Sequence, residues 1–240
     1  MTTVTLIPVL RDNYCYILET PDGACVVIDA GEADPVIAYL ERRHLIPAFI
    51  LNTHHHGDHT AGNSALQARY ACDIYGPEKE LRQIPSLTKT LKDKDILPLG
   101  MQENIHIIET SGHTQGALCY HLPASHILFT GDTLFSMGCG RLMGGTAEQF
   151  WQSLQKISAL PDETLIYCGH EYTQNNGAFG LHIEPDNPDI QRRMQEVEHL
   201  RAQGKPTLPV TLGMEKKTNV FLRAESAVRF AQLRHEKDGF

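Results

Sequence analysis

The 240-residue chain has no long hydrophobic run, no closely paired cysteines and no excess of positive charge. Its longest uninterrupted apolar stretches hold five residues, whereas a membrane-spanning helix needs about 20. Segment 1–14 lacks a basic region followed by an apolar stretch, so it does not resemble a secretory signal. We therefore expect a cytoplasmic protein with no membrane partner, long enough to bury a core without disulfide bonds.

The six cysteines are scattered, and no two form a Cys-x-x-Cys pair. This spacing predicts buried free thiols and argues against a structural zinc site, which favours paired cysteines. Acidic residues outnumber basic ones by 29 to 21, which argues against a nucleic-acid-binding protein because such proteins usually carry a basic excess. The acidity is uneven, since residues 174–240 contain 10 basic and 9 acidic residues.

Short apolar strands alternate with helical patterns over the first 173 residues. Strands are expected at 4–10, 14–19, 24–29, 48–52, 72–75, 105–109, 117–122, 126–130 and 164–168, and helices at 34–44, at 60–71 and from the capping box Thr146 to Gln149 onward. After Tyr172, prolines interrupt a stretch with two helical patterns, at about 189–203 and 224–236. This shift in composition predicts two domains, 1–173 and 174–240.

Residues 53–59 read Thr-His-His-His-Gly-Asp-His and directly follow the expected strand 48–52. Functional residues of α/β proteins commonly lie at such carboxyl ends of strands. His54 and His56 would point to the same side of an extended loop and share a cation, while Asp58 and His59 could reach a second. A solvated histidine-rich loop is the alternative, but a mixture of imidazole and carboxylate at fixed spacing favours a metal site.

Three later residues, His113, Asp132 and His170, each follow a glycine at the end of an apolar strand. Glycine there allows a sharp turn and a close approach of the backbone. Each residue alone would more often be an ordinary buried polar group, but the recurrence at several strand ends favours one shared site. Five histidines and two aspartates are too many for one tetrahedral ion, so we expect two divalent ions. The first would be bound by His54, His56 and His113, the second by Asp58, His59 and His170, and Asp132 would bridge them. Such ligands suit Zn, Fe or Mn, with zinc the first expectation.

The motifs THHHGDH (53–59), GHT (112–114), GDT (131–133) and CGHEY (168–172), in this order, resemble the metallo-β-lactamase superfamily. GCGR (138–141), GHEYT (169–173) and the R-x-x-K sequence at 234–237 make the whole chain resemble the hydroxyacylglutathione hydrolases (glyoxalase II). The resemblance implies an α+β fold, a four-layer αββα sandwich followed by a C-terminal helical domain that binds substrate. It also implies that the glutathione moiety is bound by Arg141, Tyr172, Arg234 and Lys237. Arg234 and Lys237 would share one helix face. Met143 departs from the family, which often has an aromatic hydroxyl there.

The activity that this resemblance implies is hydrolysis of S-(2-hydroxyacyl)glutathione thioesters, such as S-D-lactoylglutathione, by a hydroxide that bridges two metal ions and is oriented by Asp58. The chain would act as a monomer. The alternatives are a one-iron persulfide dioxygenase, a non-catalytic or electron-transfer module, and a β-lactamase. Catalysis by Cys139 is disfavoured because no base is committed to it, and His55 has no assigned role beyond a supporting or surface position.

Overall fold

The computed structural model describes residues 2–101 and 103–240. The chain forms two compact units, one of Met1–Glu109 with Gln115–Ser125 and the other of Thr110–Thr114 with His126–Phe240. Within the described residues, no helix is both long enough and apolar enough to cross a membrane. The predicted domain boundary at residue 173 concerns a different division of the chain and stays a prediction.

The first unit contains a six-stranded sheet in the order β1-β2-β3-β4-β5-β6. Its antiparallel half is formed by β1 (Thr3–Val9), β2 (Asn13–Glu19) and β3 (Cys25–Ile28). β2 and β3 are joined by the turn 20–23, whose sequence Thr-Pro-Asp-Gly suits a tight reversal. The other half is parallel, with β4 (Phe49–Leu51), β5 (Asp73–Pro77) and β6 (Lys89–Leu91). Parallel strands need crossover connections, and these carry the functional loops.

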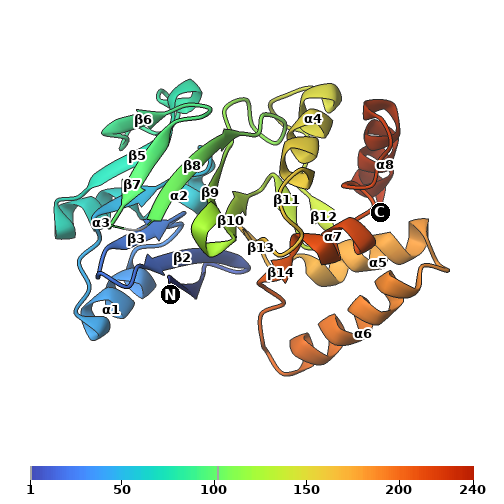
Figure 1. Ribbon diagram of the computed structural model, residues 1–240, viewed down its shortest axis with the longest axis horizontal. Coiled ribbons are helices and arrows are strands. Elements are labelled where there is room, and N and C mark those ends of the chain that lie inside the picture. The colour runs from blue at the N-terminus through green and yellow to red at the C-terminus, as the bar shows by residue number, and fades with distance from the viewer. Residues whose placement is uncertain (1, 102) are drawn as a thin grey trace. The chain divides into compact units, whose positions relative to one another are not determined.

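Helices provide two of these crossovers (Figure 1): α1 (Asp34–Arg43) connects β3 to β4, and α2 (Gly57–Thr60) with α3 (Asn63–Tyr70) connects β4 to β5. Pro35 lies in the first turn of α1, where its missing N–H is not needed. The helix ends at His44 in the left-handed conformation. The predicted helix 60–71 corresponds to α3, and a separate short helix that was not predicted, α2, precedes it and carries Asp58 and His59.

Alternate residues of the sheet form one side of the first unit's core. Cys15 and Ile17 on β2 and Val27 on β3 pack with Val36 and Leu40 of α1 and with other buried residues of the same cluster. Burying a side chain of this kind stabilises the fold by about 1.5–3 kcal/mol. The strand that ends at the histidine loop is thus attached to a rigid, closely packed sheet.

Three further strands of the first unit form an antiparallel meander of β7 (Ile96–Leu99), β8 (Glu103–Glu109) and β9 (Leu118–Leu122). β8 alternates buried and more exposed positions, as expected for a strand with one solvated face. A single turn of 3-10 helix, η1 (Glu78–Glu80), follows β5. The backbone amide of Leu118 donates to the carbonyl of Thr53 over 2.8 Å, so the start of β9 contacts the histidine loop.

In the second unit, β10 (Ile127–Gly131) pairs in parallel with β13 (Leu165–Cys168), and β13 pairs with β14 (Val210–Thr211). A small hairpin is formed by β11 (Leu134–Phe135) and β12 (Gly138–Cys139). Helix α4 (Ala147–Ser158) begins at the predicted capping box, in which Gln149 N–H donates to Thr146 Oγ1 over 3.2 Å and Gln149 Oε1 accepts from Thr146 N–H over 2.9 Å. Phe150 on this helix is fully buried.

Four helices rather than the two predicted follow β13: α5 (Thr173–Ile183), α6 (Pro188–Ala202), α7 (Leu212–Thr218) and α8 (Ala227–Gly239) (Figure 1). Aromatic rings connect α8 to α4, and connect α5 to the segment between α7 and α8. The ring of Phe230 on α8 lies 5.3 Å from that of Phe150, and Phe221 lies 5.7 Å from Phe179 on α5. The sequence patterns missed α5, whose glycines weaken its helical signal, and α7, which has only two turns.

Candidate metal centre

The histidine loop follows β4, and its first histidine is fully buried. Nε2 of His54 lies 3.0 Å from Nδ1 of His56, which agrees with the orientation predicted from their spacing. The other ring nitrogen of His54, Nδ1, lies 3.0 Å from the hydroxyl of Thr53. One nitrogen of each ring is therefore directed toward a common point, at a separation that suits one cation.

Asp29, the residue directly after β3, forms hydrogen bonds with this loop. Its Oδ1 accepts the Thr53 amide over 2.8 Å, and its Oδ2 accepts the Thr53 hydroxyl over 2.7 Å. Oδ2 also lies 3.0 Å from Nδ1 of His59. Histidines that bind metals commonly donate their second N–H to a carboxylate, which leaves the other nitrogen free to coordinate. The sequence prediction omitted Asp29, although it ends a predicted strand as the other acidic and imidazole candidates do.

Asp58 and His59 lie on the single turn of α2. Asn13 donates through Nδ2 to Oδ2 of Asp58 over 2.9 Å and to its carbonyl over 3.3 Å. Nε2 of His59 lies 3.7 Å from the same carboxylate. A Cβ atom at Gly31 would lie 2.0 Å from the carbonyl oxygen of Asp58, so this turn requires glycine at position 31. These contacts determine the direction of the Asp58 carboxylate.

In the second unit, Asp132 lies between two histidines. Its Oδ2 is 3.4 Å from Nε2 of His113 and 3.4 Å from Nε2 of His170. All three residues are at least nine-tenths buried. The second ring nitrogen of His113, Nδ1, lies 2.9 Å from the carbonyl of Arg141, which suits donation from Nδ1 and coordination by Nε2. A carboxylate oxygen equidistant from two imidazoles is suited to a bridging ligand.

Glycines around Asp132 act as the sequence predicted. Gly131 has φ of 46°, a left-handed conformation that glycine adopts without strain. A Cβ atom at Gly140 would lie 2.2 Å from the carbonyl of Asp132 and 2.8 Å from Nδ1 of His113. The loop that carries the GCGR sequence can therefore approach these two ligands only because it has glycine at this point.

Aromatic rings hold the imidazole of His170. The ring of Tyr172 stacks on it at a centroid distance of 4.6 Å with the planes 8° apart. Phe135, from β11, contacts the edge of both rings, at 5.8 Å from His170 and 5.3 Å from Tyr172. Tyr172, predicted to bind substrate, is thus also placed against a candidate metal ligand.

The seven candidate ligands form two groups, within each of which the ligand atoms lie within 4.8 Å of one another. One group comprises His54, His56, His113 and Asp132, and the other comprises Asp58, His59 and His170. The division of the six other ligands is the one expected from the sequence, Asp132 falls in the first group, and its bridging role stays a prediction. Imidazole and carboxylate without thiolate form a donor set suited to Zn, Fe or Mn, so the residues present fit divalent cations.

The six cysteines, which all lie within the described residues, take no part in these groups; they are buried thiols outside any disulfide bond. Burial raises the pKa of the Cys139 thiol to about 11, although the neighbouring Arg234 guanidinium opposes that rise. Burial likewise raises the pKa of Cys168 to about 12. A nucleophilic cysteine needs a lowered pKa and some exposure. These thiols have neither, which argues against catalysis by cysteine.

The predicted glutathione-binding arginines lie in different environments. Arg141 is exposed, and its Nε lies 4.0 Å from Asp238. Arg234 is buried and donates through Nη1 to the carbonyl of Cys139 over 3.0 Å and through Nη2 to Asp238 over 2.9 Å. Its guanidinium lies over the ring of Phe221, 5.1 Å from the centroid. Arg234 therefore attaches α8 to the loop 138–141, a structural role that the sequence prediction did not include.

Lys237 is half-buried one turn further along α8. Its ammonium donates to the carbonyl of Asn175 over 3.0 Å and lies 5.3 Å from the ring of Phe179 and 5.0 Å from that of Phe240. Burial, together with the charge of Arg234, lowers the pKa of Lys237 to about 8. Met143 is exposed, and its amide donates to the carbonyl of His113 over 3.3 Å.

His55, which had no assigned role, contacts a buried carboxylate. Its Nδ1 lies 2.9 Å from Oε2 of Glu80, which is only 1% exposed. The sequence offered no signal for this contact, because Glu80 lies 25 residues further along the chain.

Comparison with known proteins agrees with this architecture. Residues 9–170 match the Metallo-beta-lactamase superfamily, and residues 171–240 match the Hydroxyacylglutathione hydrolase C-terminus. Among solved structures, the crystal structure of ETHE1 from Myxococcus xanthus aligns with a TM-score of 0.73 at 22% identity, over 98% of this chain and 90% of that one. The predicted α+β fold with the metallo-β-lactamase architecture and a C-terminal helical region is confirmed.

Curated relatives define the family more narrowly. A hydroxyacylglutathione hydrolase of Rhodospirillum rubrum is 48% identical over 222 residues, which cover 92% of this chain and 86% of the relative. A hydroxyacylglutathione hydrolase of Rhizobium meliloti is 43% identical over 244 residues, which cover 95% of each chain. The chain therefore belongs to the hydroxyacylglutathione hydrolase family of the metallo-β-lactamase superfamily.

Proposed function

We propose that this chain hydrolyses S-(2-hydroxyacyl)glutathione thioesters, with S-D-lactoylglutathione as the first substrate to test, to glutathione and a 2-hydroxy acid. The observation that carries the proposal is that the imidazole and carboxylate side chains form two clusters. Within each cluster, the ligand atoms lie within 4.8 Å of one another. The names of the curated relatives support the substrate class. The proposal includes a monomer that acts in the cytoplasm.

The residues that would hold the two cations are His54, His56, His113 and Asp132 for the first and Asp58, His59 and His170 for the second, with Asp132 shared. Zinc is the first candidate, and iron or manganese would suit the same ligands. When bound, such a pair of divalent cations supplies polarisation of the thioester carbonyl and a water-derived nucleophile at neutral pH.

The protein's own contribution is orientation. Asp29 holds His59 through Nδ1, and through Thr53 it also restrains His54. Asn13 fixes the carboxylate of Asp58, which we assign to orienting the attacking water. Groups held in this way lose little freedom during the reaction, which lowers its barrier.

The leaving group explains why no protein acid is needed. A thiol has an ordinary pKa of about 8.5, so a glutathione thiolate can depart without a proton from the enzyme. Lys237, with its pKa lowered to about 8, remains largely protonated at neutral pH and can bind an anionic glutathione group. We also assign Arg141 and Tyr172 to binding glutathione. Arg234 supports this binding because its hydrogen bond to the carbonyl of Cys139 holds the loop before Arg141.

The test is hydrolysis of S-D-lactoylglutathione by purified, metal-loaded protein, followed by the loss of thioester absorbance. We expect turnover by the wild type, and loss of both turnover and bound metal in His54→Ala. The matched control is His44→Asn, which changes an exposed histidine at the end of α1 and should leave both unchanged. Wild-type turnover no faster than that of His54→Ala would refute the proposal. One iron per chain with oxygen consumption on glutathione persulfide would replace it with a dioxygenase.

A further inference from the structure

Glu80 is a buried carboxylate whose two oxygens each accept a hydrogen bond from a different loop. Oε2 lies 2.9 Å from Nδ1 of His55, and Oε1 accepts the backbone amide of Gly116 over 2.8 Å. Glu80 is 1% exposed, so these two hydrogen bonds replace those that its carboxylate would form with water. Burying a carboxylate is costly unless its hydrogen bonds are well made, so this geometry is strongly determined.

The bond to His55 acts at the centre of the histidine loop. His55 lies between His54 and His56, whose facing ring nitrogens are 3.0 Å apart. The ring of His55 lies 4.8 Å from that of His56, with the planes 68° apart. Glu80 therefore holds a side chain that packs directly against one of the two candidate ligands.

The contact with Gly116 tightens the same region. A Cβ atom at Gly116 would lie 2.8 Å from Cγ of Glu80 and 2.8 Å from Cβ of Lys79. Only glycine allows the segment before β9 to approach so closely. Two residues later the amide of Leu118 donates to the carbonyl of Thr53, so segment 116–118 contacts both Glu80 and the histidine loop.

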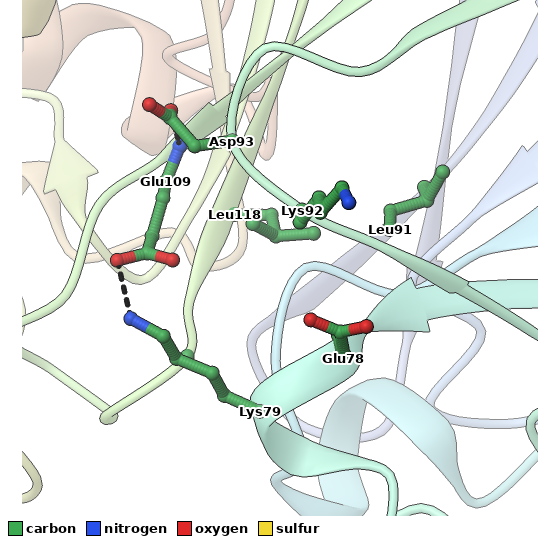
Figure 2. Close-up of a pocket in the computed structure, with 8 residues that line it drawn as sticks. Glu78, Lys79, Leu91, Lys92, Asp93, Glu109 and Leu118 are labelled. Atoms are coloured by element: carbon green, nitrogen blue, oxygen red, sulfur yellow. Dashed lines mark hydrogen bonds and ion pairs between the residues drawn. The ribbon is translucent and has the colours of Figure 1, made fainter.

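Glu80 itself is carried by a well-anchored turn. Glu78 and Lys79, the first two residues of η1, line a cavity of about 170 Å³. Figure 2 shows the ion pair between Lys79 and Glu109, the last residue of β8. The Lys79–Glu109 distance is 2.6 Å. The amide of Glu109 donates in turn to Asp93 over 2.8 Å. The turn is thus attached to β8 through Lys79, next to the buried Glu80.

We propose that Glu80 is a positioning residue for the first metal group, acting through His55 on His54 and His56. It touches neither substrate nor cation. Its carboxylate restrains the loop at residue 55. The imidazoles of His54 and His56 are therefore already placed close together, and little conformational entropy is lost when a cation binds. The inference rests on the proposed metal site and adds to it a residue outside the ligand set.

The experiment measures the zinc affinity of the full chain by competition with a chelator, and the thermal midpoint of the metal-free protein. Changes to groups that support metal ligands commonly reduce affinity by about 10- to 100-fold. We expect Glu80→Ala to show a loss in that range and a lower kcat with KM little changed. Glu80→Gln should restore most of the affinity, because its amide can still serve Gly116 and His55.

Glu103→Ala is the matched control. Glu103 is another buried carboxylate of the same unit, and it accepts hydrogen bonds from Thr2 and Ser125, away from the histidine loop. This variant should lower the thermal midpoint and keep wild-type zinc affinity. Wild-type affinity in folded Glu80→Ala would overturn the inference, and so would an equal loss of affinity in Glu103→Ala.

A second single variant, His55→Ala, covers the case in which Glu80→Ala is poorly folded, and it should also reduce zinc affinity. His55→Ala removes the same hydrogen bond from the other side, so Glu80→Ala combined with His55→Ala should lose no more affinity than the larger single loss. Losses that add fully would overturn the inference. If the wild type binds zinc and hydrolyses the thioester while these variants match it, only the inference fails. If the wild type does neither, the proposed function fails.

Discussion

Asp29→Asn changes one oxygen of a buried carboxylate into an NH₂ group at the point where three hydrogen bonds meet. The remaining amide oxygen can still accept from the Thr53 backbone, as Oδ1 does over 2.8 Å. The new NH₂ group then faces Nδ1 of His59, at the position where Oδ2 lies 3.0 Å away. An amide nitrogen only donates, so His59 must present Nδ1 as an acceptor and carry its proton on Nε2. A protonated Nε2 cannot bind a cation.

The size of the effect follows from this change of tautomer. Altering the partner of a metal-binding histidine commonly costs about 10- to 100-fold in metal affinity, or about 1.4–2.8 kcal/mol. We expect Asp29→Asn to lie at the upper end of this range, because the same carboxylate also holds the hydroxyl of Thr53, which contacts His54. The loss should be greater for the group that contains His59 than for the other.

The assay is zinc titration against a chelator, with stoichiometry measured after gel filtration and circular dichroism to verify folding. Asp34→Asn is the control, because Asp34 is an exposed acid in the first turn of α1. It should retain two tightly bound ions. Folded Asp29→Asn with wild-type affinity for both ions would refute the argument that Asp29 determines the tautomer of His59.

The remaining predictions concern charge and pH. Asp132→Ala should abolish turnover through loss of metal, whereas Lys237→Ala should mainly raise KM, because Lys237 would bind a part of the substrate remote from the carbonyl. Since the pKa of Lys237 is lowered to about 8, wild-type KM should rise as pH increases through 8, and an unchanged pH profile in Lys237→Ala would contradict this. Burial raises the pKa of Glu215 from 4.5 to about 7, so the folded state binds more protons than the unfolded state between these values. Stability should therefore fall by about 3 kcal/mol between pH 4.5 and 7. Urea unfolding gives the free energy of unfolding of the metal-free wild type and of Glu215→Gln. The difference between these two free energies should change with pH in this window and be constant above it.

Local patterns predicted most elements correctly in kind, and they marked the candidate ligands, whose role stays a prediction. Alternating apolar runs marked the strands, and the capping box at Thr146 marked the start of α4, because both depend on neighbours in the sequence. The C-terminal helices were harder. α7 begins at Leu212, and the hydroxyl of its N-cap Thr211 accepts from the amide of Met214. The helix has too few turns to show a period in the sequence.

The environment of several side chains depends on partners that are distant in the sequence. Arg234 was expected to bind substrate from a helix face shared with Lys237, and the structure buries it against the carbonyl of Cys139, 95 residues away. Whether it also contacts glutathione stays a prediction. A sequence pattern reports the period of a helix but not which of its faces is covered, because the covering element comes from elsewhere in the chain.

The sequence by itself determined the chemistry available to this protein: histidines and aspartates at strand ends, glycines beside them, no paired thiolates, and a helical C-terminal segment with basic residues. Tertiary structure alone decided how those groups are held. The buried Asp29 restrains His59, Glu80 restrains His55, and Oδ2 of Asp132 lies between two imidazoles. The physical reason is that donor identity is a property of each residue, whereas the direction of a ring nitrogen depends on a hydrogen-bond partner brought close only by folding.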